Sequence, residues 1–124
     1  MTDDAAMDMK VLVLESNPRN LELLQVLLEK EGCRVIPAGQ SARLESLLEQ
    51  SPDLALVDIA GFGPEIWTHC EQLRAAGIPF VVISPRQSRN IEQASRAAGA
   101  DQLLVKPLLM RELLGVVERL VAER

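Results

Sequence analysis

Four side chains whose types suit phosphoryl chemistry each follow a short apolar run of the sequence. They are Glu15 after VLVL, Asp58 after LALV, Ser84 after FVVI and Lys106 after LLV. Two carboxylates can hold a hard cation such as Mg²⁺, which prefers oxygen ligands. A carboxylate can also accept a phosphoryl group, while an ammonium group and a hydroxyl can hold the equatorial phosphoryl oxygens. Phosphoryl transfer needs mainly positioning and charge neutralisation, so these residue types would suffice if the fold brings them together.

The four apolar runs that precede these side chains, and a fifth at residues 34–36, predict strands buried on both faces. Five such runs occur, at residues 11–14, 34–36, 54–57, 80–83 and 103–105. They are nearly continuous in apolar character, as is typical of parallel strands that are covered on both sides. Polar residues often end strands, so any one of the four alone would be weak evidence. Their coincidence after four separate runs is more specific.

The segments between the runs carry helix signals. Pro18 suits a first helical position, and Ser16 or Asn17 can serve as its N-cap. Glycine and proline mark most of the other boundaries. We expect helices from Pro18 to Gly32, from Ser41 to before Pro52, from Pro64 to about Ala76, from Ser88 to Gly99, and from about Leu108 to the C-terminus.

This alternation predicts an α/β fold, a (βα)₅ doubly wound parallel five-stranded sheet with right-handed crossovers. The flavodoxin-like strand order 2-1-3-4-5 is the expected winding. In open sheets of this kind, ligands bind outside the carboxyl ends of the strands. The four polar side chains are therefore expected to share one edge of the sheet.

Length and composition limit the classes of function. The 124 residues are 48% hydrophobic, which fits one domain with its own core. The net charge of −5 and the lack of a clustered Lys/Arg stripe argue against direct contact with nucleic acid. The sequence shows no signal peptide and no apolar run of about 20 residues, so we expect no membrane segment and a cytoplasmic location. Cys33 and Cys70 are expected to be buried thiols.

The segments VLVLESN, DLALVDIAG, FVVISP and LLVKP resemble the receiver domain of bacterial two-component response regulators, over essentially the whole chain. The resemblance implies a receiver domain at residues 10–124, after a short acidic extension at residues 1–9. It implies that Asp58 is the phospho-acceptor, that Lys106 pairs with the phosphoryl group and that Ser84 hydrogen-bonds it.

The resemblance also implies a Mg²⁺ site, held by Glu15, by Asp58 and by the backbone carbonyl of Ala60. Ser16 stands where the family has the second residue of an acidic pair, which is the usual direct metal ligand, and the resemblance implies that Ser16 is a weak ligand in its place. The site thus keeps fewer carboxylates than the family, and we expect weak Mg²⁺ binding. Leu103 stands where many members have a switch Tyr or Phe, so the switch is atypical as well.

The resemblance implies transfer of a phosphoryl group to Asp58 from a histidine kinase or a phosphotransfer protein. The output would be an altered contact with a downstream effector protein or domain. Such a domain is not an enzyme beyond catalysing its own phosphoryl transfer and dephosphorylation. The alternative is a phosphorylation-independent pseudo-receiver that acts as a protein-binding module. A flavodoxin-like nucleotide binder is disfavoured because the first turn, ESNPRN, lacks a glycine-rich phosphate loop.

The last predicted helix carries two apolar stripes at helical spacing. One consists of Leu109, Leu113, Val116 and Leu120, and the other of Met110, Leu114, Val117 and Val121. In one interpretation the sheet buries both stripes. In the other, the second stripe, with Leu114, Val117 and Val121, joins a homodimer or partner interface, since exposed apolar patches mark interaction sites.

Overall fold

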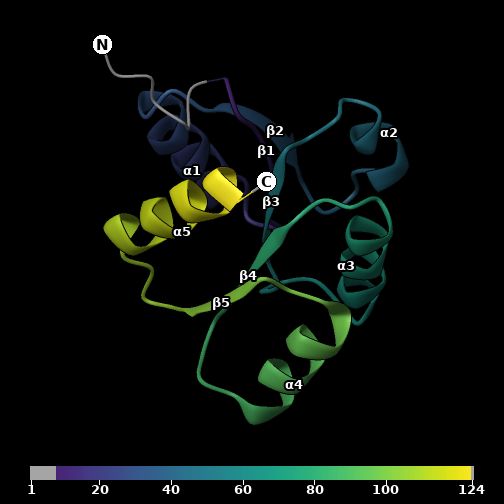
Figure 1. Ribbon diagram of the computed structural model, residues 1–124. Helices are drawn as coiled ribbons and strands as arrows, with labels where there is room; N and C mark the ends of the chain where they lie inside the picture. Colours follow the sequence, from purple (N-terminus) through teal and green to yellow (C-terminus); the bar gives the residue numbers. More distant parts are fainter. Residues whose placement is uncertain (1–7, 124) are drawn as a thin grey trace.

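Five parallel strands in the order β2-β1-β3-β4-β5 form the centre of the computed structural model, which describes residues 8–123 (Figure 1). The strands are β1 (Lys10–Leu14), β2 (Arg34–Ala38), β3 (Leu54–Asp58), β4 (Phe80–Ser84) and β5 (Gln102–Val105). The helices are α1 (Pro18–Lys30), α2 (Leu44–Leu48), α3 (Glu65–Ala75), α4 (Arg89–Ala98) and α5 (Met110–Glu123). The predicted (βα)₅ flavodoxin-like fold and strand order are confirmed.

Side-chain alternation along the strands divides the core into two layers. In β1, Val11 and Val13 face the layer of α1 and α5, whereas Leu12 and Leu14 face the layer of α2, α3 and α4. The other central strands alternate in the same way, because successive side chains of a strand point to opposite faces. Both layers are apolar and buried, which explains why the strand sequences read as continuous apolar runs.

Most helix boundaries follow the predicted signals. Asn17 caps α1, where its side chain accepts hydrogen bonds from the N–H groups of Arg19 and Asn20. Ser88 caps α4, and Gly99 ends that helix with a φ of 94°. The predicted cap at Ser41 is wrong, because α2 begins only at Leu44. Similarly, α3 begins at Glu65, one residue after Pro64, and α5 begins at Met110 instead of about Leu108.

The buried face of α5 combines residues of both predicted stripes. Leu113, Val117, Leu120 and Val121 are the buried residues of this helix. Val117 and Val121, which we assigned to a possible interface, therefore lie in the core beside α1 and the sheet. Leu114 is half-buried against the same core, and Leu109 is 59% exposed. The interpretation that the second stripe joins an interface is therefore wrong for Val117 and Val121.

Met9 is already part of the buried core. This residue, which we assigned to the acidic extension, is buried and accepts a hydrogen bond from the Arg34 N–H through its carbonyl. Most of the predicted extension, residues 1–7, lies outside the described residues. Cys33 and Cys70 are free and buried, as expected. No helix within residues 8–123 is long and apolar enough to cross a membrane.

One edge of the sheet is formed by β2, which pairs only with β1 among the described strands. Arg34 donates its N–H toward β1, so alternate residues of β2 turn their N–H positions to the other side. Pro37 has one of these outward positions and is exposed. Because proline has no N–H, its place in the strand removes no hydrogen bond to β1.

Candidate functional site

Glu15 and Asp58 lie side by side because they continue the same face of adjacent strands. Leu14 and Val57 are partners in the register of β1 and β3, and the next residue of each chain carries the carboxylate. Both follow the alternation that turns Val13 and Leu56 toward α1 and α5. Each residue is only 2% exposed. The fold therefore buries two carboxylates together at the carboxyl edge of the sheet.

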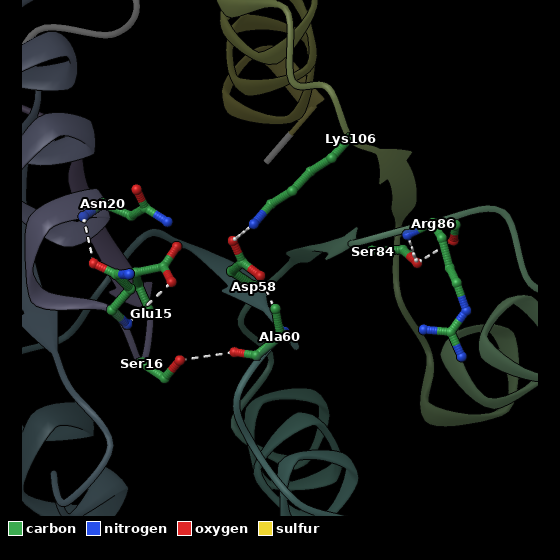
Figure 2. Close-up of polar contacts among 9 residues, drawn as sticks. Glu15, Ser16, Asn20, Asp58, Ala60, Ser84, Arg86 and Lys106 are labelled. Carbon is green, nitrogen blue, oxygen red and sulfur yellow. Dashed lines mark hydrogen bonds and ion pairs between the residues drawn. The ribbon is translucent and has the colours of Figure 1, made fainter.

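Asp58 is held by a cation and by a backbone donor (Figure 2). The Nζ atom of Lys106 lies 2.8 Å from Oδ2 of Asp58, and the Ala60 N–H donates to Oδ1 over 3.1 Å. Lys106 follows the last residue of β5, and its side chain is 30% exposed. The ammonium group therefore reaches the carboxylate from the solvent side and balances its charge.

Glu15 is the least satisfied polar group of the site. The Asn17 N–H donates to its Oε2 over 3.3 Å, while Oε1 is buried and has no hydrogen-bond partner among residues 8–123. Burial, followed by the nearby Asp58 carboxylate, raises the pKa of Glu15 from 4.5 to about 7. At neutral pH the side chain is therefore partly protonated.

Ser16 joins two loops of the site. Its hydroxyl donates to the carbonyl oxygen of Ala60 over 2.8 Å, although the two residues are 44 positions apart. The next carbonyl, that of Gly61, accepts from Nε2 of Gln40 over 3.0 Å. The loop after Asp58 is thus held at consecutive carbonyls by side chains from the loops that follow β1 and β2. The Gln40 contact has no signal in the sequence, because it depends on the approach of these loops.

The oxygen atoms that face one another could hold a divalent cation. Among the described residues there is no group of three or more His, Cys, Asp or Glu side chains that could hold a metal. Two carboxylates and a carbonyl remain, namely Glu15, Asp58 and Ala60, and oxygen donors of this kind suit Mg²⁺. The unpartnered Oε1 of Glu15 is a free acceptor for such an ion. The Ala60 carbonyl already accepts from Ser16, so one of the three ligands is shared.

Ser84 lies at the same edge, but its hydroxyl points elsewhere. It continues the face of Phe80 and Val82, on the side of α3 and α4, opposite to that of Asp58. The hydroxyl donates to the Arg86 carbonyl over 2.6 Å and accepts from the Arg86 N–H over 3.4 Å (Figure 2). Leu103 is half-buried in the same layer. The structure therefore brings Glu15, Ser16, Asp58, Ala60 and Lys106 together and turns Ser84 toward its own loop.

A pocket of about 360 Å³ opens beside the two carboxylates. Lys106 and Asn20 contribute polar groups, and the rest of the wall is apolar, with Leu23, Leu24, Leu27, Pro107, Leu108 and Met110. Leu23 is 57% exposed. Sequence reasoning missed the contribution of α1, although the helical spacing of Leu23 and Leu27 is visible in the sequence.

Comparisons with known proteins agree with this geometry. Residues 11–118 match the model of the response regulator receiver domain family. The chain is 32% identical over 123 residues to the transcriptional regulatory protein AruR of Pseudomonas aeruginosa, covering 94% of this chain and 50% of AruR. It is 30% identical over 116 residues to the sensor protein GacS of Pseudomonas syringae, covering 87% of this chain and 13% of GacS. The chain thus spans half or less of the length of these relatives.

Solved structures show the same similarity. The activated receiver domain of RstA from Klebsiella pneumoniae superposes with a TM-score of 0.81 at 25% identity, covering 90% of this chain and 97% of that one. The receiver domain of TorR, a regulator of the TMAO respiratory system, gives a TM-score of 0.83 at 26% identity, covering 93% and 98%. The chain belongs to the response regulator receiver domain family, whose members act in phosphorelay signalling.

Proposed function

We propose that Asp58 accepts a phosphoryl group from a phosphohistidine and that the modified domain signals through altered protein–protein contacts. The observation that carries this proposal is the 2.8 Å ion pair between Lys106 and Asp58 at the wall of an open pocket. A buried carboxylate that is reachable from the pocket, with a fixed cation beside it, has what an acceptor of an anionic group requires.

In the proposed reaction an oxygen of Asp58 attacks phosphorus, and the bond from phosphorus to the histidine nitrogen breaks as the new P–O bond forms. The departing imidazole retains the electron pair of the broken bond. Lys106 balances the negative charge of the transferred group, and the Ala60 N–H holds the carboxylate in place. A Mg²⁺ ion held by Glu15, Asp58 and the Ala60 carbonyl would neutralise further charge between carboxylate and phosphoryl oxygens.

The pocket suggests how a phosphoryl donor protein approaches. Its apolar rim includes Leu23, Leu27 and Leu108, directly beside Asp58 and Lys106. A histidine kinase or phosphotransfer protein that places its imidazole at Asp58 must cover this rim. The downstream effector, as a separate protein or as a further domain, is proposed by analogy with the longer relatives.

Phosphorylation by acetyl phosphate tests the proposal without knowledge of the kinase. We expect the purified domain with Mg²⁺ to gain the mass of one phosphoryl group, because attack by Asp58 expels acetate. Asp58→Asn should abolish the gain, while Glu49→Gln, which changes an exposed carboxylate, should leave it unchanged. A wild-type domain that gains no mass over a wide range of Mg²⁺ concentrations would contradict the proposal and point to a pseudo-receiver.

A further inference from the structure

We propose that Ser16 is a positioning residue that arranges the acceptor loop without a metal ion and competes with a divalent cation for the Ala60 carbonyl. This inference deepens the proposed function and rests on it, since it assigns Asp58 as the acceptor and Ala60 as a cation ligand. The Ala60 carbonyl oxygen can accept the Ser16 hydroxyl proton or bind a cation, and the inference is that each weakens the other.

The first support is a chain of contacts that runs from Ser16 to Asp58. The Ser16 hydroxyl donates to the Ala60 carbonyl over 2.8 Å, and the N–H of the same residue donates to Asp58 over 3.1 Å. Ala60 is thus fixed at both polar groups of its backbone. By holding the carbonyl, Ser16 helps to orient the N–H that contacts the acceptor carboxylate (Figure 2).

The second support is the shape of the backbone behind Ser16. Gly61 has a φ of 83°, a conformation that glycine adopts at no steric cost. A Cβ atom at this position would collide with the Ser16 side chain. The bond from Gln40 to the Gly61 carbonyl, 3.0 Å long, holds the loop from its other side. The close approach of Ser16 is therefore built into the loop and is not a chance contact of an exposed side chain.

The third support is the chemistry of the shared carbonyl. The Ala60 carbonyl oxygen has two lone pairs, and Ser16 directs its hydroxyl proton at one of them. A cation on the other lone pair would lie near the positive end of this O–H group, which opposes the cation and supplies no negative charge in return. The bond that orders the loop in the metal-free protein thus lowers its affinity for the cation.

An NMR titration of the ¹⁵N-labelled domain with MgCl₂ tests the competition without measuring activity. In Ser16→Ala the carbonyl is released, and we expect Mg²⁺ to bind about two- to tenfold more tightly, the range that corresponds to one hydrogen bond. Ser46→Ala, which changes an exposed serine in α2, should leave the affinity within about twofold. A weaker or unchanged affinity in Ser16→Ala would overturn the competition. Structural damage would weaken binding, so a gain in affinity is specific.

Amide hydrogen exchange in EDTA tests the positioning role. We expect the Ala60 and Phe62 amides, which donate to Asp58 and to the Ile59 carbonyl, to exchange about two- to tenfold faster in Ser16→Ala, because one hydrogen bond of the loop is lost. Ser16→Thr retains the hydroxyl and should restore slow exchange. Unchanged exchange in Ser16→Ala, or equally fast exchange in the threonine variant, would overturn this role. Both measurements are independent of phosphorylation. The absence of a phosphoryl mass gain would therefore refute the proposed function but not the role of Ser16.

Discussion

Lys106 forms an ion pair with Asp58 across the end of β4, a strand that contains neither residue. Asp58 ends β3 and Lys106 follows β5, and β4 lies between these strands in the sheet. The 2.8 Å contact is possible because the lysine side chain reaches past the end of β4, where Ser84 is turned to the opposite face. The ion pair therefore ties the edge strand β5 to the centre of the sheet.

Removal of this charge should affect both phosphorylation and stability. Lys106→Met keeps an unbranched side chain of similar length but removes the ammonium group, so Asp58 has no cation beside it. We expect phosphorylation by acetyl phosphate to slow by at least about tenfold, because the charge that balances the phosphoryl oxygens is lost. The free energy of unfolding should fall by about 1 to 3 kcal/mol, since a buried carboxylate remains unpaired. Intact mass and urea unfolding measure the two effects. Lys30→Met, at the exposed end of α1, is the matched control, and equal rates in the two variants would exclude the role.

The raised pKa of Glu15 predicts a pH-dependent stability of the metal-free domain. The pKa of Glu15 is about 7 in the folded domain and 4.5 when the side chain is free in solvent, as in the unfolded chain. Between pH 4.5 and about pH 7 the folded state therefore binds more protons than the unfolded state. The contribution of Glu15 to stability is therefore complete below pH 4.5 and is lost as the pH rises to about 7. The loss amounts to at most about 3 kcal/mol.

Glu15→Gln should remove this part of the slope. Urea unfolding in EDTA between about pH 5 and pH 8 gives the comparison with wild type. Above about pH 7 the glutamine variant should be the more stable of the two, because a buried charge has been removed. The same decline of stability with pH in both proteins would show that other groups cause it.

The orientation of Ser84 predicts that its hydroxyl changes partner when Asp58 is modified. In the unmodified domain it is bonded to Arg86, and it must leave this partner to reach a phosphoryl group. With beryllofluoride, a phosphoryl mimic, we expect NMR shifts at the Arg86 and Gln87 amides in wild type and much smaller ones in Ser84→Ala. Phosphorylation itself should continue in the variant, since Asp58 and Lys106 are retained. Large shifts at both amides in Ser84→Ala would contradict this coupling.

The burial of α5 predicts the oligomeric state. Val117 and Val121 are in the core, so little apolar surface remains on this helix for a second copy. We expect the unphosphorylated domain to sediment as a monomer, and Leu114→Asp to leave the sedimentation coefficient unchanged. A wild-type dimer that Leu114→Asp dissociates would restore the homodimer hypothesis, with Leu114 and Leu109 as its contacts.

The fold could be predicted because β1, β3, β4 and β5 are marked by nearly continuous apolar runs, β2 by a shorter one, and most helices by a cap or a glycine. Residues such as Asn17, Ser88 and Gly99 act locally, so their signals are visible in a few neighbouring positions. The same local reasoning failed at Ser41. There the helix begins where Leu44 enters the core, and tertiary packing overrides the capping preference.

The site could be predicted only as a set of residues at one edge. That Glu15 and Asp58 face each other follows from strand register, which the sequence alone does not fix. The bond from Ser16 to Ala60 joins two loops that are 44 residues apart and requires the backbone turn at Gly61. The inner face of α5 was uncertain because both stripes are apolar, and the rotation of the helix about its axis is decided by its packing on α1 and the sheet.

Pro37 has a consequence for how the domain behaves at high concentration. The open side of β2 offers its N–H and C=O groups to any extended segment that could add a further strand, and such edges are where chains aggregate or exchange strands. Because the outward position of Pro37 has no donor, an incoming strand cannot complete its ladder there. One residue that is remote from the acceptor thus protects the domain against strand addition at this edge.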